Sequence, residues 1–526
     1  MNSLLKSNLA VASGTAMSRL TGLIRVAVFF AVLGRSALSD AYNQANATPN
    51  LVYELLLGGI LSSSLVPLFT RLHHDEDREG EVAVRTVTLI ALGAITAVSV
   101  LLAPWIFSLY ATATSSGVDA DLYREVGGTL AAFFLVQVFF YGLNAVLGAQ
   151  LQARGRFFAA AWAPALSNVA IIASLLIVPL LIDGEPTLET VLSNDALRFT
   201  LGVGATAGIA VMALALLPSL AASGAPMGFR ADLRHPAITT LRKLSGWALG
   251  YVVANQVAIL VVQNLLVRSG AGEQSAYVLA FTFFVLPHGL LAMSIVTTFL
   301  PDMSRAVADR DRPRLIERTH LGLTTIALLT IPAGAGLFVL RQPIIALAAG
   351  YGNFEPDDVL AASRALAGFA LGLGAFSLYL FVLRVFYAHH DARTPFVINV
   401  GENLLNIVLA LLLWERYGAM GLAIAFAVSY VLSALWSMQV LGYKVRGFPV
   451  RSVLATCGRM VLAAVVMMEV VWVATQVVGS NDGWGALARV VVGTVVGIAS
   501  YLGVLWLLGA PEPRQLRAAL RRSSQG

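Results

Sequence analysis

The sequence has very little charge. Only 12% of its 526 residues are charged and 58% are hydrophobic, with a mean hydropathy of +0.77, whereas a soluble domain carries roughly 25% charged residues. This composition excludes a soluble enzyme. At one span per roughly 35 to 40 residues, the chain holds about 13 to 15 membrane-spanning helices, which leaves no room for a sizeable soluble domain.

Cysteine and lysine are also scarce, which excludes several chemistries. Cys457 is the only cysteine and lies in an apolar run, so an internal disulfide and a cysteine-based metal site are both excluded. None of the three lysines, Lys6, Lys243 and Lys444, follows a glycine, so the Walker A loop of a primary pump is absent. No His-Glu-x-x-His or Gly-x-Ser-x-Gly motif occurs either. We therefore expect a transporter without a bound organic cofactor rather than an enzyme.

Apolar runs bounded by charged or turn-forming residues predict an all-α polytopic membrane protein with 14 transmembrane helices. The predicted spans are 9–33, 41–70, 82–110, 126–153, 159–182, 198–220, 241–267, 275–300, 315–340, 359–388, 396–414, 419–441, 452–478 and 486–508.

The distribution of basic residues predicts the orientation. With the N-terminus in the cytoplasm, 23 of the 35 basic residues fall on the cytoplasmic side and five within spans. By the positive-inside rule we expect both termini in the cytoplasm of a bacterial cell membrane. The basic tail, Arg514–Arg522, fits a topological anchor, although a lipid or nucleic-acid patch is the alternative; we expect no nucleic-acid partner. Seven arginines fall on the outer side: Arg35, Arg124, Arg198, Arg268, Arg341, Arg416 and Arg489.

An internal repeat predicts the domain organisation. Asp40-Ala41-Tyr42 opens the second span and Val66-Pro67-Leu68 closes it, while Ser275-Ala276-Tyr277 and Leu300-Pro301-Asp302 bound the eighth span in the same way. Such repeats are common in secondary transporters, although chance similarity between apolar segments is the alternative. We expect two pseudo-symmetric six-helix bundles, 1–225 and 226–445, followed by two further helices and a basic tail in 446–526.

Polar residues in the first two spans predict a hydrated interior surface. Arg19 and Arg25 lie mid-span, where each guanidinium would cost about 2.5 to 3.5 kcal/mol at the bilayer centre. The second span carries a dense group of polar residues that includes Asp40, Asn50 and Glu54. We expect these five residues to bind substrate. The alternative is that the arginines pair with Asp40 or Glu54 to hold helices together.

Two later spans suggest an ion-coupling site. Glu402 and Asn406 lie four residues apart on one face of the eleventh span, and Asn255 lies in the seventh. A buried carboxylate beside amide oxygens suits Na⁺ or a proton, although interhelical hydrogen bonding alone would also explain the amides. Coupling to Na⁺, to H⁺ or to the membrane potential alone therefore stays open. Glu469 in the thirteenth span has no assigned role.

The N-terminal motifs resemble the signature of one transporter family. Ser18-Arg19-Leu20-Thr21-Gly22-Leu23-Ile24-Arg25, Ser39-Asp40-Ala41-Tyr42, Pro49-Asn50-Leu51 and Val66-Pro67 are similar to the MurJ (MviN) lipid II flippases of the multidrug/oligosaccharidyl-lipid/polysaccharide exporter superfamily. Arg384-Val385-Phe386-Tyr387-Ala388 resembles the same family's connection between spans ten and eleven. The resemblance implies that Arg19, Arg25 and Asp40 are cavity residues.

The sequence departs from the family pattern at three positions. Tyr53 stands where well-known Gram-negative members carry an arginine after Pro-Asn-Leu, and Thr282 and Val285 stand where they carry an arginine and a glutamate in the eighth span. The cavity should therefore be less positive. Either Arg19 and Arg25 recognise most of the headgroup, or Arg268 or Arg384 contributes.

The resemblance implies a flippase that moves undecaprenyl-pyrophosphate-linked peptidoglycan precursor, lipid II, from the inner to the outer leaflet by alternating access. Its partners would be lipid II, the bilayer and the proteins of cell-wall synthesis and division. A related drug or polysaccharide-lipid exporter, or a cell-wall scaffold that transports nothing, are the alternatives.

Overall fold

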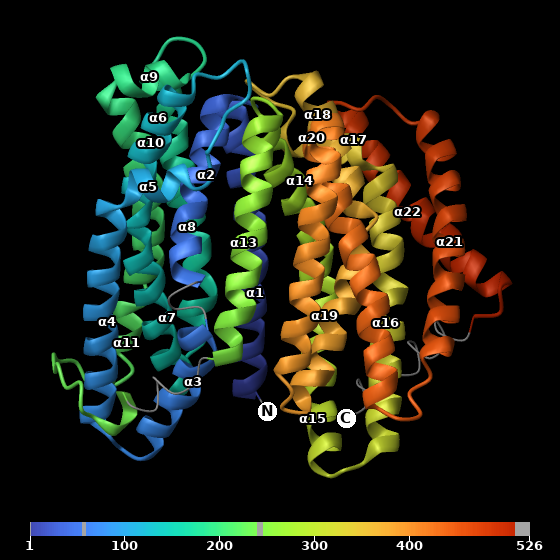
Figure 1. Ribbon diagram of the computed structural model, residues 1–526, viewed down its shortest axis with the longest axis horizontal. Helices are drawn as coiled ribbons and strands as arrows, with labels where there is room; N and C mark the ends of the chain where they lie inside the picture. The colour runs from blue at the N-terminus through green and yellow to red at the C-terminus, as the bar shows by residue number, and fades with distance from the viewer. Residues whose placement is uncertain (1, 55–58, 239–245, 511–526) are drawn as a thin grey trace. The chain divides into compact units, whose positions relative to one another are not determined.

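The computed structural model describes residues 2–54, 59–238 and 246–510, and this part of the chain is helical without strands. Contacts divide the chain into two compact units (Figure 1). Unit 1 comprises residues up to Gln274 together with Tyr351–Phe354. Unit 2 comprises Ser275–Gly350 and the residues from Glu355 onward.

Unit 1 is built on long helices that pack lengthwise. α1 packs along α8, α2 along α6, and α10 along α8 and α7. Its helices are α1 (Asn2–Leu33), α2 (Ala37–Tyr53), α3 (Gly59–His74), α4 (Arg78–Leu101), α5 (Ala103–Ser108), α6 (Ala120–Leu135), α7 (Gln137–Ala153), α8 (Phe158–Ile177), η2 (Val178–Leu180), α9 (Leu188–Ser193), α10 (Asp195–Leu214), α11 (Leu217–Ala221) and α13 (Gly246–Ser269).

In unit 2, α16 packs against α21, α21 against α22, and α20 against α18 and α19. Phe284, Phe369, Phe376 and Phe426 pack together in its core with ring centroids 5.3 to 5.8 Å apart. The helices are α14 (Glu273–Pro287), η3 (His288–Ala292), α15 (Met293–Ala308), α16 (Arg312–Val339), α17 (Arg341–Ala349), α18 (Pro356–Ala370), α19 (Leu373–Ala388), α20 (Arg393–Lys444), α21 (Val450–Gln476) and α22 (Gly483–Leu507).

The ends of the helices follow from local side-chain chemistry. Ser36 caps α2 by accepting a hydrogen bond from the Ser39 N–H, and Asp77 and Asp311 cap α4 and α16 in the same way. Short polar side chains at these positions satisfy backbone donors that have no partner within the helix. The turns at the ends of spans are therefore encoded locally.

The long helix α20 is two helices joined at one residue. Gly418 has φ 50° and ψ −135°, a conformation that is essentially restricted to glycine. The predicted eleventh and twelfth spans lie on either side of it. The chain can therefore turn there without a loop.

The all-helical membrane fold is confirmed, but the count of fourteen spans is not. The described residues contain 11 helices long and apolar enough to cross a membrane, or 12 if α18 and α19, which meet at 45°, form one span. Two predicted spans are merged in α20, and the predicted span 41–70 lies partly outside the described residues.

Helix α13 is anchored within unit 1, although the repeat would put it in the second bundle. The side-chain oxygen of Asn264 accepts hydrogen bonds from the Thr112 N–H and hydroxyl at 3.0 and 2.7 Å. The Asn264 amide donates to the Leu109 carbonyl at 2.6 Å, and Arg268 donates to the Thr112 hydroxyl at 2.9 Å. The contact boundary after Gln274 thus differs from the repeat boundary at 225/226, which stays a prediction.

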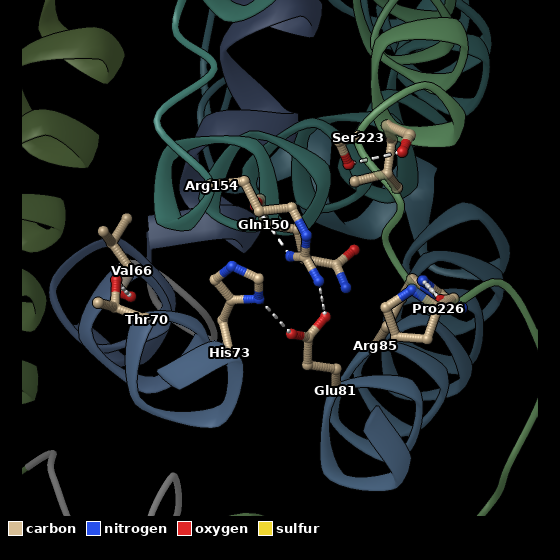
Figure 2. Close-up of polar contacts among 10 residues, drawn as sticks. Val66, Thr70, His73, Glu81, Arg85, Gln150, Arg154, Ser223 and Pro226 are labelled. Atoms are coloured by element: carbon tan, nitrogen blue, oxygen red, sulfur yellow. Dashed lines mark hydrogen bonds and ion pairs between the residues drawn. The ribbon is translucent and has the colours of Figure 1, made fainter. Parts of the chain in front are cut away.

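A buried ion pair holds one end of unit 1 together (Figure 2). Arg154 Nη2 lies 2.5 Å from Glu81 Oε2, and their side chains are only 6% and 2% exposed. His73 approaches the other carboxylate oxygen at 3.7 Å. Arg85 donates to the carbonyls of Pro226 and Gly228 at 2.8 and 3.0 Å, so the segment after α11 is held on α4.

Removing the acid of this pair should destabilise the fold. Glu81→Gln leaves the Arg154 guanidinium buried without its counter-ion, a change that typically costs about 3 to 5 kcal/mol. Glu79→Gln is the matched control, because Glu79 forms an exposed pair with Arg230, worth at most about 1 kcal/mol. Thermal unfolding of the purified protein should show a much larger loss for Glu81→Gln; equal losses would contradict this account.

A second charged contact lies outside the spans, between α19 and α20. Asp391 accepts hydrogen bonds from the Thr394 N–H at 3.0 Å and hydroxyl at 2.7 Å, and from Lys444 at the end of α20. Partial burial raises the pKa of Asp391, but the hydrogen bonds from Lys444 and Thr394 outweigh this and lower the pKa to about 2.

This lowered pKa predicts a pH-dependent stability. A carboxyl whose folded pKa lies below its unfolded value of about 3.9 stabilises the fold above that value and loses the contribution as the pH falls through the folded pKa. Asp391→Asn should therefore lower the melting temperature by a constant amount above about pH 5. The difference should shrink between pH 4 and pH 2; a pH-independent difference would argue against this contact.

Candidate functional site

The two arginines of α1 have no ion-pair partner among the residues that the structure describes. Arg19 is exposed and Arg25 is half-buried. Among the residues that the structure describes, neither guanidinium has a hydrogen-bond or ion-pair partner. In the described residues the two arginines therefore form no ion pair with Asp40 or Glu54, which was the alternative. Because an unpaired guanidinium in hydrocarbon is costly, both side chains require water or an anionic ligand.

Helix α1 is held in place by a buried amide of α8. Asn168 Nδ2 donates to the Ser18 carbonyl at 3.1 Å and to the Thr21 hydroxyl at 3.0 Å. This contact is made beside Arg19 and about one helical turn before Arg25. It positions the helix without consuming either guanidinium.

Two tyrosines lie near Arg25, and a third lies beside one of them. Tyr42 of α2 and Tyr141 of α7 are close enough to Arg25 to interact with its charge. The ring of Tyr53 lies 6.2 Å from that of Tyr141. Tyr53, which stands where some relatives are expected to carry an arginine, thus joins this cluster. The cluster of Arg25, Tyr42, Tyr53 and Tyr141 offers one cation and three hydroxyl groups on three helices.

The other predicted substrate residues of α2 differ in their surroundings. Asp40 is buried, and its Oδ2 accepts a hydrogen bond from the Gly272 N–H at 2.6 Å, next to the pair of Arg35 with Glu273. Asp40 therefore ties α2 to the connection after α13. Asn50 is exposed on α2, and Glu54 is half-buried at its end. Neither side chain contacts Arg19 or Arg25 among the described residues, so substrate roles for all three stay predictions.

The predicted ion-coupling residues of α20 are buried. Glu402 is 1% exposed, and its Oε1 accepts a hydrogen bond from the Ser429 hydroxyl at 3.1 Å. Ser429 lies in the second half of α20, so this bond spans the turn at Gly418. Asn406, one helical turn from Glu402, is buried, and its Oδ1 has no hydrogen-bond partner in the described part of the chain. An acidic group and a spare amide oxygen thus share one face.

The remaining candidates lie elsewhere. Asn255 belongs to unit 1, where its amide donates to the Tyr251 carbonyl one turn earlier on α13 at 3.1 Å. Arg268 is exposed at the end of α13. Arg384 is exposed on α19 and has no ion-pair partner in the described residues. Glu469 is exposed on α21. Roles for these residues stay predictions.

Sequence reasoning missed several polar neighbours. Tyr141 lies near Arg25 because α7 and α1 belong to the same packed unit, and no local sequence pattern predicts this proximity. Ser429 was detectable, because Ser429, Ser433 and Ser437 recur every four residues and all three are buried. Such a spacing indicates a polar stripe on an otherwise apolar helix.

Unit 2 contains a large apolar cavity. Its volume is about 860 Å³, and α16, α21 and α22 line it with side chains that include Leu337, Leu340, Met467, Val471, Ile498 and Leu502. The walls are almost entirely hydrocarbon. Such a cavity suits an alkyl or polyprenyl chain rather than a polar solute.

Long apolar helices that carry charged residues within the spans are typical of multi-pass membrane transporters, and this is the class of the protein. The comparisons give the family. The protein-family model described as "Lipid II flippase MurJ" matches residues 29–492, and the chain belongs to this family.

Relatives from several bacteria are similar over nearly their whole length. A probable lipid II flippase of Vibrio cholerae is 27% identical, with 98% of each chain covered. The lipid II flippase of Burkholderia cenocepacia is 26% identical, with 96% of this chain and 98% of the relative covered. The probable flippase of Thermotoga maritima is 28% identical, with 81% and 83% covered.

Solved structures show the same fold. A lipid II flippase MurJ in an inward closed conformation superposes with a TM-score of 0.76 at 23% identity, covering 95% of this chain and 98% of that one. A multidrug resistance MATE transporter of the MOP superfamily, in an inward-facing conformation, gives 0.62 at 16% identity, with 84% and 99% covered.

Proposed function

We propose that this protein is a lipid II flippase that moves the lipid-linked peptidoglycan precursor from the inner to the outer leaflet by alternating access. Membership of the MurJ family across residues 29–492 carries the proposal. Arg19 and Arg25 of α1, which have no ion-pair partner in the described part of the chain, support it, because the diphosphate of lipid II is an anion that such guanidinium groups bind.

The diphosphate would be bound at α1. Arg19 and Arg25 each offer a fork of N–H donors that matches phosphate oxygens and forms charge-assisted hydrogen bonds. Tyr42 and Tyr141, which lie near Arg25, and Tyr53, which lies beside Tyr141, would add neutral hydrogen bonds through their hydroxyls. This is how a chain with Tyr53 and Thr282 would recognise the headgroup with few cations.

The polyprenyl tail would lie in the apolar cavity of α16, α21 and α22. Only the headgroup needs a hydrated path, since the tail can stay in hydrocarbon throughout. Separating the two in this way lowers the cost of translocation, because no long apolar chain has to cross a polar cavity.

The membrane potential would supply driving force in the proposed orientation, with both termini in the cytoplasm. Each negative charge that moves outward across a negative-inside potential gains about 2.3 kcal/mol per 100 mV. The same field favours the return of an empty, positively charged site. A cation at Glu402 would serve the same reset, with Ser429 and Asn406 as further oxygen ligands.

Loss of either α1 arginine should impair translocation. In cells depleted of their own flippase, Arg19→Ala or Arg25→Ala should reduce lipid II transport by roughly 10- to 100-fold, because charge-assisted hydrogen bonds of about 1.5 to 3 kcal/mol disappear. The readout is the leaflet in which lipid II accumulates, at equal expression.

Arg71→Ala is the matched control, since Arg71 is exposed near the end of α3 and forms a surface pair with Asp75. It should transport normally. Normal transport by the Arg19 and Arg25 variants would refute their role. Accumulation of another lipid-linked glycan, or drug sensitivity, would instead indicate a different exporter of the superfamily.

The coupling proposal has its own test. Glu402→Gln should slow translocation in reconstituted vesicles and abolish its response to a Na⁺ or pH gradient, because the neutral amide cannot bind a cation through charge. Glu415→Gln, an exposed acid of the same helix, should leave the response intact. Transport that ignores both the substitution and the gradients would rule out coupling at this site.

A further inference from the structure

A second, polar cavity lies at one end of unit 2. Its volume is about 310 Å³, and it is enclosed by the end of α16, the start of α17, the end of α21 and the connection into α22. Its polar lining consists of Arg341, Gln342, Thr475, Gln476, Asn481 and Arg489. The space is about ten times the volume that one water molecule takes up in liquid water.

The cavity is positively charged and has no acid in its lining. Arg489 donates from Nε to the Val478 carbonyl at 2.7 Å and from Nη1 to Asn481 Oδ1 at 2.6 Å. Arg341 donates from Nη1 to the Phe338 carbonyl at 2.6 Å. Within the described ranges, Nη2 of each guanidinium has no acceptor. Two cations with spare donors therefore share a cavity without a counter-ion.

Four of the seven arginines that the sequence assigns to the outer side have no ion pair in the described residues, and Arg341 and Arg489 are the two of these that line the polar cavity. Three of the seven form ion pairs: Arg35 with Glu273, Arg124 with Asp121, and Arg198 with Asp195. Arg341 and Arg489 form none in the described part of the chain. Burial lowers the pKa of Arg341, which shows that its charge is partly desolvated. A desolvated cation that lacks an acid favours an anionic ligand.

The polar cavity adjoins the apolar cavity described above. Leu340 lines both, and the residues after Arg489 on α22, Gly493 and Thr494, already line the apolar one. One end of the combined space thus suits a phosphate and the other suits a hydrocarbon chain. That division matches a lipid rather than a free anion.

Tryptophans place the polar cavity at the level of a membrane interface. Trp472 lines it and is half-exposed, and Trp484 is exposed at the start of α22. Tryptophan is enriched where lipid headgroups meet the hydrocarbon core. A lipid phosphate would lie at this depth.

We infer that Arg341 and Arg489 bind the phosphate of a membrane lipid whose hydrocarbon chain lies in the adjoining apolar cavity. The assignment of this site to the outer leaflet rests on the orientation given under the proposed function. The binding site itself is argued without that orientation. Two lipids share the required chemistry: an anionic phospholipid, and the polyprenyl phosphate or diphosphate end of the translocated lipid.

Binding to the purified full-length protein by native mass spectrometry tests this inference. Two pairs of probes differ in phosphate: phosphatidylglycerol against diacylglycerol, and undecaprenyl phosphate against undecaprenol. At least one phosphate-bearing probe should bind about tenfold or more tightly than its partner, from charge-assisted contacts. The pair that shows the preference identifies the source of the phosphate.

In the Arg341→Gln/Arg489→Gln double variant the phosphatidylglycerol preference should disappear, and the undecaprenyl phosphate preference should fall to what the α1 arginines alone provide. Arg416→Gln is the matched control, because Arg416 is another arginine assigned to the outer side in unit 2 but does not line the polar cavity. It should keep both preferences. Equal binding within both pairs by the unmodified protein, or a double variant that binds every probe as the unmodified protein does, would overturn the inference.

A second measurement needs no variant. Added salt should weaken the phosphate preference of the unmodified protein, because salt screens charge contacts but not apolar burial. A preference that ignores salt would also overturn the inference. Since these assays measure binding and not translocation, their failure is distinguishable from failure of the proposed flippase activity.

Discussion

The free-energy cost of placing a charged side chain in an apolar medium constrains the whole structure. The buried pair of Glu81 with Arg154 meets it by mutual neutralisation, and the buried carboxylate of Glu402 meets it in part through the Ser429 hydroxyl. Among the described residues Arg19 and Arg25 have neither kind of partner, although they lie in a membrane-spanning helix. The candidate site therefore consists of cations for which the described part of the chain supplies no counter-charge. A protein can keep such groups only where water or a ligand reaches them.

The fold could be predicted from the sequence to the extent that it depends on apolar runs and turn residues. Spans such as 315–340 and 452–478 match α16 and α21 closely, because a long hydrophobic run can be satisfied only as a helix in lipid. The count of fourteen spans stays a prediction. Glu415 and Arg416 separate the predicted eleventh and twelfth spans, whereas the structure continues one helix, α20, through Gly418, and the predicted span 359–388 is bent by 45° between α18 and α19. The anchoring of α13 on Thr112 depends on contacts between residues far apart in sequence.

The candidate site was predictable only in part, for a similar reason. Arginine in a hydrophobic run is conspicuous, so Arg19 and Arg25 could be named at once, and so could Glu402. Their neighbours could not, since Tyr141 reaches Arg25 from another helix and Asn168 binds α1 across 147 residues. Asp40 shows the converse problem. Its sequence context suggested a ligand contact, while its carboxylate is engaged by the Gly272 backbone. Arg341 and Arg489 were visible only as outer-side charges, because their shared cavity exists only after α17, α21 and α22 have packed.

The glycine at position 418 has a wider effect than its size suggests. The two halves of α20 are fixed at two points, the turn itself and the bond between Glu402 and Ser429 on its far sides. Because both points fix the same two helices, the angle between them at Gly418 determines how closely Ser429 approaches Glu402. An L-amino acid at this position would force a different angle, and the acid would lose its hydrogen bond without any change in its own surroundings along the helix. The hydrogen bonding of Glu402 thus depends on Gly418, a residue sixteen positions away that has no side chain of its own.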